Sequence, residues 1–411
     1  MAESLSRGLT RRSFVQRSAA AGVTILGGTL WATGPAAARA SRTRKVDTPI
    51  EHLIISCQEN RSFDHYYGFA PQVQQAGYGP PPGYTQPDGQ GGAVTPFEFT
   101  ALSTPDIDHS WGAVHSEWNG GAMDGFYTTD GIDCMGYYTA AELPFYYSLF
   151  DDSALCANYF CSLLGPTWPN RFYFAAGTSG GITTNGVWGY GVFDYPIILD
   201  LLDEAGVSWQ IYNMNFDSVP YGNTDNVFVF WDRYAHDNRT RGSKGGFLND
   251  VRKGQLPQVS WVIPSFAHHK DEHPPADVSV GMGLQEELIT GLRESPLWQS
   301  SAYLLTYDEH GGYFEHVPPP QLDAYGLSIR VPLWVISPFA KTGPVQSALP
   351  AEHSSTLKLI EALHGLPTLA SQNHLFDSAT PTGSNYQANG APAPPRDARA
   401  DISDLLDLFT F

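Results

Sequence analysis

The sequence predicts an α/β protein whose mostly parallel sheet is covered by helices on both faces. Two observations lead to this prediction. Short apolar runs, typical of buried strands, alternate along the chain with segments whose apolar residues recur at helical spacing. The 411 residues are 42% apolar, 13% aromatic and only 16% charged, so the chain can bury a large core and is not of the disordered class.

Each predicted element has a local signature. The strand at 52–56 is a short apolar run, and a second run at 259–263 is ended by Pro264. The helices at 196–205 and 355–364 are each followed by glycine, which readily adopts the left-handed conformation that ends a helix. The other predicted strands are 154–160, 208–212, 302–307 and 331–336, and the other predicted helix is 284–292.

Residues 1–40 are predicted to be a twin-arginine signal peptide. Arg11 and Arg12 precede an uncharged, mildly apolar run that ends in small residues suited to cleavage. A weak membrane anchor is the alternative. With no linker visible after it, 41–411 is expected to form one domain. We expect export by the twin-arginine machinery to the periplasm, cell wall or exterior, with no integral membrane span in the mature form.

The charge balance excludes some classes of partner. The chain has 23 basic and 42 acidic residues and a net charge of −19, and removing 1–40 would make this −23. A nucleic-acid binder needs a basic face, so no nucleic-acid partner is expected, and anionic membranes would be repelled. An oxidising destination permits disulfides among the four cysteines, but the sequence leaves their pairing open.

Two pairs of oxygen-bearing residues follow predicted strands. Glu59-Asn60 comes after the strand at 52–56, and Asp308-Glu309 comes after the strand at 302–307. Ligand sites of open parallel sheets lie beyond the carboxyl ends of the strands, so the two pairs are candidates for one divalent cation site. The alternative is that each is an ordinary helix cap or solvated loop.

Hydroxyl and imidazole groups supply candidate catalytic residues. Thr167 lies between Pro166 and Pro169, and a helix beginning after Pro169 would place its hydroxyl near an anion-binding N-terminus. An ordinary turn is the alternative. Several histidines lie in polar surroundings, where imidazole can ligate a metal, bind phosphate or protonate a leaving group. They are His109, His268, His269, His273, His310, His316 and His353.

Six motifs, in chain order, resemble those of the bacterial phosphoesterase family, which holds phosphatidylcholine-type phospholipases C and a related acid phosphatase. The resemblance covers most of the chain beyond residue 40, and the sequence departs from it at His310, where many relatives have Asn or a small residue. The motifs are 59–68 (ENRSFDHYYG), 108–110 with 118–126, 166–171 (PTWPNR), 272–275 (EHPP), 306–319 (TYDEHGGYFEHVPP) and 330–332.

The resemblance implies a three-layer α/β/α fold like that of alkaline phosphatase. It implies that Glu59, Asn60, Asp308 and Glu309 hold a divalent metal whose identity, Ca, Mn or Zn, stays open. Thr167 would be the nucleophile of a covalent phospho-enzyme, with His109 and His273 at the phosphoryl oxygens or the leaving group. The remaining candidates, Asn170, Arg171 and His353, would bind or orient the substrate.

Three functions compete at this stage. The first is phospholipase C-type cleavage of a phospholipid headgroup. The second is a broad-range acid phosphatase acting on small phosphoesters with the same site. The third is a secreted binding protein without catalysis, which would require the loss of Thr167 or of the acidic pairs. Nearby aromatic residues would form either a cage for a quaternary ammonium or part of the core: Trp111, Trp118, Tyr127 and Trp168.

Overall fold

The computed structural model describes residues 43–186, 191–214, 225–371 and 390–411. The chain divides into two units between Arg39 and Ala40, and the second unit, Ala40–Phe411, is compact. The predicted signal peptide at 1–40 lies outside the described residues and stays a prediction, as does the domain boundary at 41.

A seven-stranded sheet forms the centre of the second unit, in the order β11-β6-β10-β9-β1-β8-β7. The four strands from β9 to β7 are parallel neighbours, β11 is parallel to β6, and β10 is antiparallel to β9 and β6. Within this sheet, β10 alone runs against the others. The strands are β1 (His52–Gln58), β6 (Ala154–Cys156), β7 (Trp209–Asn213), β8 (Val259–Ile263), β9 (Ser301–Tyr307), β10 (Leu333–Ile336) and β11 (Gly343–Val345).

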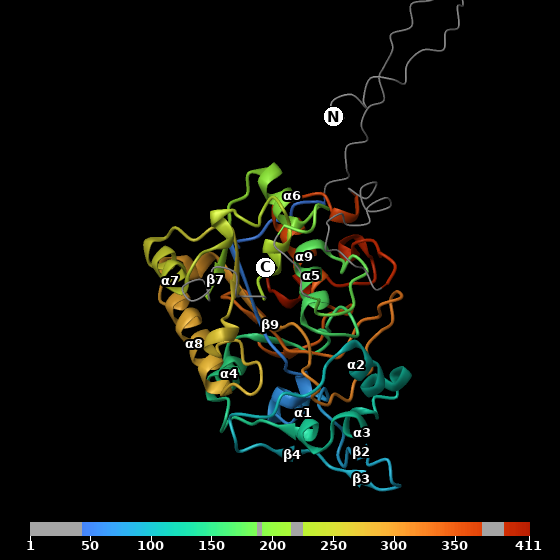
Figure 1. Cartoon of the computed structure of the whole chain (residues 1–411). Helices are drawn as coiled ribbons and strands as arrows, with labels where there is room; N and C mark the ends of the chain where they lie inside the picture. The colour runs from blue at the N-terminus through green and yellow to red at the C-terminus, as the bar shows by residue number, and fades with distance from the viewer. Residues whose placement is uncertain (1–42, 187–190, 215–224, 372–389) are drawn as a thin grey trace, which may run out of the picture. The chain divides into compact units, whose positions relative to one another are not determined.

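Helices cover both faces of this sheet. Alternate residues of a strand point to opposite faces. Ser56 on β1 accepts a hydrogen bond from Gln285 of α8 (Val278–Arg293), whereas Cys57 lines a small space together with Phe174 of α5 (Thr167–Ala176). Helices α7 (Lys244–Lys253) and α4 (Pro144–Ser148) pack on α8, and α6 (Ile198–Ala205) and α9 (Ser354–His364) pack on α5 (Figure 1). The predicted three-layer arrangement with a mostly parallel sheet is therefore confirmed.

Short elements surround these layers. Two small sheets pair β2 (Gln86–Pro87) with β3 (Ala93–Val94) and β4 (Phe97–Glu98) with β5 (Gly136–Tyr137). The α-helices are α1 (Pro71–Ala76), α2 (Trp111–Trp118), α3 (Phe126–Asp130), α4 (Pro144–Ser148), α5 (Thr167–Ala176), α6 (Ile198–Ala205), α7 (Lys244–Lys253), α8 (Val278–Arg293) and α9 (Ser354–His364).

Several predicted boundaries are correct, and others are wrong. The strand predicted at 154–160 ends at Cys156, and the strand predicted at 331–336 begins only at Leu333. Helices α6 and α9 end at Gly206 and Gly365, both left-handed, as expected. Helix α8 begins six residues before the predicted start, because Asp277 caps it by accepting from the N–H of Ser279. Helix α5 begins at Thr167 rather than after Pro169, since a proline in the first turn removes no intrahelical hydrogen bond.

The parallel strands place their carboxyl ends at one edge of the sheet. β6 also points this way, because β10 runs antiparallel both to it and to β9. The segments that follow β1, β6, β7, β8 and β9 therefore start at a common edge, where the candidate site residues lie. Among the residues that the structure describes, no helix is both long and apolar enough to cross a bilayer.

We predict that the fold does not depend on disulfides. All four cysteines are buried free thiols. Burial raises the pKa of Cys156 to about 12 and raises the pKa of the other three thiols as well, so reactive thiolate is scarce. A thiol reagent should label the folded protein hardly at all and all four cysteines after unfolding. A melting temperature that falls when reductant is added would contradict this prediction.

Candidate active site at the carboxyl edge of the sheet

The four predicted metal ligands lie together at the ends of two neighbouring strands. Gln58 and Tyr307 are register partners at the last position of β1 and β9, so the chain leaves both strands side by side. The backbone N–H of Asn60 then donates to Asp308 Oδ1 at 3.3 Å, although the two residues are 248 positions apart. All four side chains are buried.

Asn60 stands between the two glutamates. Its backbone is left-handed (φ 63°), a conformation that asparagine tolerates better than most residues. The end of its side-chain amide lies 3.1 Å from Glu59 Oε2 and 2.7 Å from Glu309 Oε1. With its amide nitrogen turned toward them, Asn60 donates a hydrogen bond to each of the two carboxylates. Gly311 closes the turn, since a Cβ there would lie 2.5 Å from the Asn60 carbonyl oxygen.

Arg171 connects the two acidic segments. From α5 its guanidinium contacts Glu59 Oε1 at 2.8 Å and Asp308 Oδ2 at 3.0 Å. The guanidinium is buried, and it also donates to the carbonyl oxygens of Gln58 and Asp225. Such a paired, hydrogen-bonded charge is stable in the interior, and its removal would leave two buried carboxylates uncompensated.

Acidic groups outnumber this one guanidinium. Asp225 and Asp271, which the sequence did not single out, interact electrostatically with Glu59. Burial, reinforced by neighbouring carboxylates, raises the pKa of Glu59 well above its ordinary value and that of Glu309 to about 7. Burial likewise raises the pKa of Asp271 to about 7. Without a further cation, these groups cannot all ionise near neutral pH.

The two predicted catalytic histidines lie beside this cluster. The rings of His109 and His273 are 6.0 Å apart, and His109 Nε2 is 3.8 Å from Glu309 Oε1. Burial opposes protonation of His109, but the Glu309 carboxylate, the hydrogen bond to the Ile107 carbonyl and the nearby aspartates together outweigh it and raise the pKa to about 9. Burial lowers the pKa of His273. The exposed Asp106 carboxylate acts on both rings. The pair therefore favours one protonated and one neutral imidazole.

A buried carboxylate fixes the backbone next to His273. Glu272 has a left-handed backbone (φ 72°). Its carboxylate accepts hydrogen bonds from Tyr66 at 2.7 Å, Tyr307 at 3.0 Å and Gln58 at 2.7 Å, and also from Tyr146. These donors come from three separate segments of the chain. His273 is thus held on a rigid support rather than on a free loop.

Thr167 is the first residue of α5 and is 5% exposed. Arg171 follows one helical turn later on the same face of the helix, so this end of α5 faces the acidic cluster. Asn170 fixes the preceding loop: its side chain accepts from the Leu163 N–H at 2.8 Å and donates to the carbonyl oxygens of Gly165 at 2.8 Å and Pro166 at 3.0 Å. The described contacts of Asn170 therefore orient the loop rather than a ligand.

A surface pocket of about 510 Å³ opens next to these groups. His109 and Pro166, the residue before Thr167, both line it, and so do Asp106, Asp108 and Trp111. The pocket thus combines an imidazole, two carboxylates and an indole beside the start of α5. Trp111, one of the four aromatic candidates for a headgroup cage, is the member of that set found in the lining.

Two further histidines support the acidic segment after β9. His353 is buried, with Nε2 2.8 Å from the Asp308 carbonyl oxygen and Nδ1 2.9 Å from the Tyr159 hydroxyl, so both ring nitrogens contact protein groups. His310 places Nε2 2.5 Å from Glu117 Oε2 and Nδ1 3.7 Å from Glu309 Oε2. Its buried Nδ1 has no hydrogen-bond partner in the described part of the chain.

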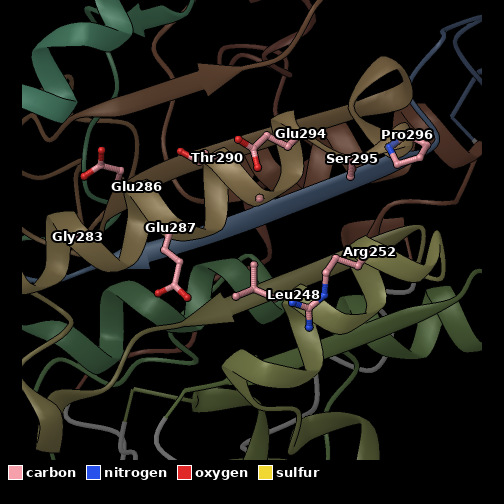
Figure 2. Close-up of a pocket in the computed structure, with 10 residues that line it drawn as sticks. Leu248, Arg252, Gly283, Glu286, Glu287, Thr290, Glu294, Ser295 and Pro296 are labelled. Carbon is pink, nitrogen blue, oxygen red and sulfur yellow. The ribbon is translucent and has the colours of Figure 1, made fainter.

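Two other features of the fold lie apart from this cluster. Asp64, Glu315 and His316 have ligand atoms within 4.8 Å of one another, but Arg330 lies 3.1 Å from Asp64 and 2.9 Å from Glu315, so an ion pair already balances them. A pocket of about 690 Å³ lies between α7 and α8 (Figure 2). It contains none of the residues predicted from the motifs.

The structure brings the predicted metal ligands, His109, His273 and Arg171 to one edge, and the roles predicted for them remain predictions. Sequence reasoning missed Asp225, Asp271 and the contact between His310 and Glu117. Asp271 directly precedes the motif at 272–275, which was an available signal. Asp225 has no motif around it, and only the fold shows that it lies near Glu59.

Comparison with known proteins supports the resemblance. A family model described as "Phosphoesterase family" matches residues 50–367. Phospholipase C B of Mycobacterium tuberculosis is 34% identical over 88% of this chain and 82% of its own length. A non-hemolytic phospholipase C of Burkholderia pseudomallei is 32% identical over 76% of this chain and 55% of its own length.

A solved structure of an alkaline phosphatase superfamily protein from Vibrio parahaemolyticus shares 12% identity and a TM-score of 0.41, covering 81% of this chain and 70% of that one. This score is low, so the fold class rests on the strand order described above. The sequence matches are decisive for the family. The chain belongs to the phosphoesterase family and is a hydrolase of phosphoric ester bonds related to the bacterial phospholipases C.

Proposed function

We propose that the protein is an exported, metal-dependent phospholipase C-type enzyme that cleaves the phosphodiester of a phospholipid headgroup through a phospho-threonine intermediate. One observation carries the proposal: the surplus of buried carboxylates lies at the sheet edge beside the N-terminus of α5, where Thr167 stands. The phospholipase C relatives support the substrate class. Export rests on the twin-arginine pattern at 10–16.

The residues at this edge fit a divalent cation. Glu59, Asn60, Asp308 and Glu309 supply oxygen ligands, and the orphaned Nδ1 of His310 is a nitrogen donor beside Glu309. The contact between His310 and Glu117 matches the carboxylate–histidine arrangement that orients metal-binding imidazoles. Oxygen ligands with imidazole suit calcium, manganese or zinc. When bound, the cation would offset charge on the phosphoryl oxygens and favour the ionised form of a nearby hydroxyl.

The chain's own groups supply the rest of the chemistry. Thr167 Oγ attacks phosphorus, its proton passing to a neighbouring base, and the bond from phosphorus to the glycerol oxygen breaks. An imidazolium at His109 or His273 protonates that oxygen, which releases diacylglycerol. Water then cleaves the threonine–phosphorus bond, which frees the phosphorylated headgroup and restores Thr167. Asn170 keeps the loop before Thr167 in place.

The pocket beside His109 favours a diester with a cationic headgroup over a phosphomonoester. Asp106 and Asp108 line it and would repel the second negative charge of a monoester, whereas they would attract a choline or ethanolamine group. Trp111 offers an aromatic face to the same cation. Rates with p-nitrophenyl phosphate, p-nitrophenylphosphorylcholine and phosphatidylcholine distinguish the two activities: the choline esters should be the better substrates.

Replacing the nucleophile should stop turnover. We predict that Thr167→Ala lowers kcat by roughly a thousandfold or more, whereas Thr167→Ser keeps a hydroxyl and measurable activity. Thr178→Ala is a matched control, because it removes a buried hydroxyl near the other end of α5 that bonds the Ala393 carbonyl. Mass spectrometry of acid-quenched enzyme should find the phosphorylated headgroup on the peptide containing Thr167. A folded Thr167→Ala protein with normal turnover would refute the mechanism.

Removing the metal should lower both activity and stability. A ligand bound only by the folded state at 100 times its Kd adds about 2.7 kcal/mol to the free energy of unfolding. We therefore expect chelation to abolish turnover and lower the melting temperature, and one of the three candidate ions to restore both. Elemental analysis of protein purified without added salts identifies the ion. Equal activity and stability in an exhaustively stripped sample would be inconsistent with the ligand set.

A bound metal ion and the Arg171 guanidinium are both expected to offset the negative charge of the same buried carboxylates. Arg171→Met should destabilise the metal-free protein by about 3–5 kcal/mol, because it leaves buried carboxylates unpaired. Saturating metal should reduce this loss. Arg396→Met is the control: Arg396 is also buried but pairs with Asp323, so metal should not change its effect. Denaturant unfolding of both variants with and without metal checks this. If metal reduced the loss of stability equally in both variants, Arg171 and the metal would not offset the same carboxylates.

A further inference from the structure

The segment between β8 and His273 has an unusual surface. Residues 265–270 read Ser-Phe-Ala-His-His-Lys, and we call them the Phe266 loop. Phe266 is 46% exposed, and the next three residues are exposed as well. An aromatic ring followed by two imidazoles and an ammonium group stands out in a chain with a net charge of −19.

The loop is built to hold this shape. The backbone N–H of His268 donates to both Ser265 Oγ at 3.1 Å and the Ser265 carbonyl oxygen at 3.3 Å. The N–H of Lys270 donates to the same carbonyl at 2.9 Å, and His269 takes a left-handed backbone (φ 56°). The turn satisfies these polar backbone groups internally, so Phe266 is displayed on an ordered turn.

The loop also lies beside the predicted active site. It starts just after the carboxyl end of β8 and leads directly into Asp271 and His273. The rings of Phe266 and His273 lie 5.1 Å apart, edge to face. A surface that meets this loop therefore also meets the opening beside the predicted leaving-group contact.

We propose that the Phe266 loop docks the enzyme on the surface of a zwitterionic phospholipid membrane. This inference rests on the proposed phospholipase function and names how that site reaches its substrate. Aromatic side chains favour the boundary between headgroups and acyl chains. The side-chain N–H donors of His268, His269 and Lys270 match phosphate oxygens of the headgroups. The acidic remainder of the chain would be repelled by an anionic bilayer, so the phosphates in contact belong to neutral lipids.

Binding can be measured apart from catalysis. In the Thr167→Ala background, which leaves vesicles intact, flotation with phosphatidylcholine vesicles reports membrane affinity. Phe266→Ala should weaken this affinity about tenfold, in line with the loss of one buried aromatic side chain. Phe266→Trp should preserve or strengthen it. Phe411→Ala is a matched control, because Phe411 is 43% exposed but packs on Phe339 and Phe409 at the chain's end.

Hydrolysis rates of the active enzyme with two substrates, one in vesicles and one soluble, distinguish a failure of the docking proposal from a failure of the proposed function. Phe266→Ala should lower hydrolysis of phosphatidylcholine vesicles about tenfold more than it lowers hydrolysis of p-nitrophenylphosphorylcholine, because any effect on the neighbouring His273 ring acts on both substrates. Equal vesicle affinity of Phe266→Ala and the parent would overturn the docking proposal. A changed oligomeric state of Phe266→Ala without vesicles would also overturn it, because it would indicate that the loop binds a second copy of the chain rather than a membrane. Failure of the wild-type chain to hydrolyse the soluble diester would instead overturn the proposed function, and the flotation result would still stand.

Discussion

The guanidinium of Arg171 joins the three chain segments on which the candidate site depends: the end of β1, the end of β9 and the helix that begins at Thr167. It offsets Glu59 and Asp308, but Glu309 and two further buried aspartates share the same space. Like charges in a low-dielectric interior repel strongly, so the cluster is stable only with protons or a cation among the carboxylates. This imbalance is the physical reason to expect a metal here rather than at the balanced Asp64 cluster.

The sheet makes this arrangement possible. Because the six strands other than β10 all run in the same direction, the segments that follow them start at one edge. That edge receives the metal candidates, the histidine pair and the nucleophile candidate from distant parts of the chain. The hydrogen bonds of Glu272 hold the backbone next to His273 at this edge, and the exposed ring of Phe266 packs against the His273 ring. Catalysis and access to lipid would thus share one end of the molecule.

Much of this was accessible from the sequence, for identifiable reasons. The strands β1 and β9 were recognisable because their central runs, 53–55 and 302–305, are continuously apolar and buried on both faces. Glycine marks helix ends through its backbone freedom. Motifs located Glu59 and Asp308. Sequence alone did not show Asp225, which reaches Glu59 only through the fold, nor that Arg171 would contact carboxylates. The start of α5 was misplaced because proline both begins and breaks helices.

The most direct test of the account is an anomalous difference map from crystals of the metal-loaded chain. The account predicts one strong peak among the side chains of Glu59, Asn60, Asp308 and Glu309, with the Thr167 hydroxyl beside it. A peak at Asp64, Glu315 and His316 instead, or an acidic cluster that stays empty while Arg171 and protons alone balance it, would contradict the central claim.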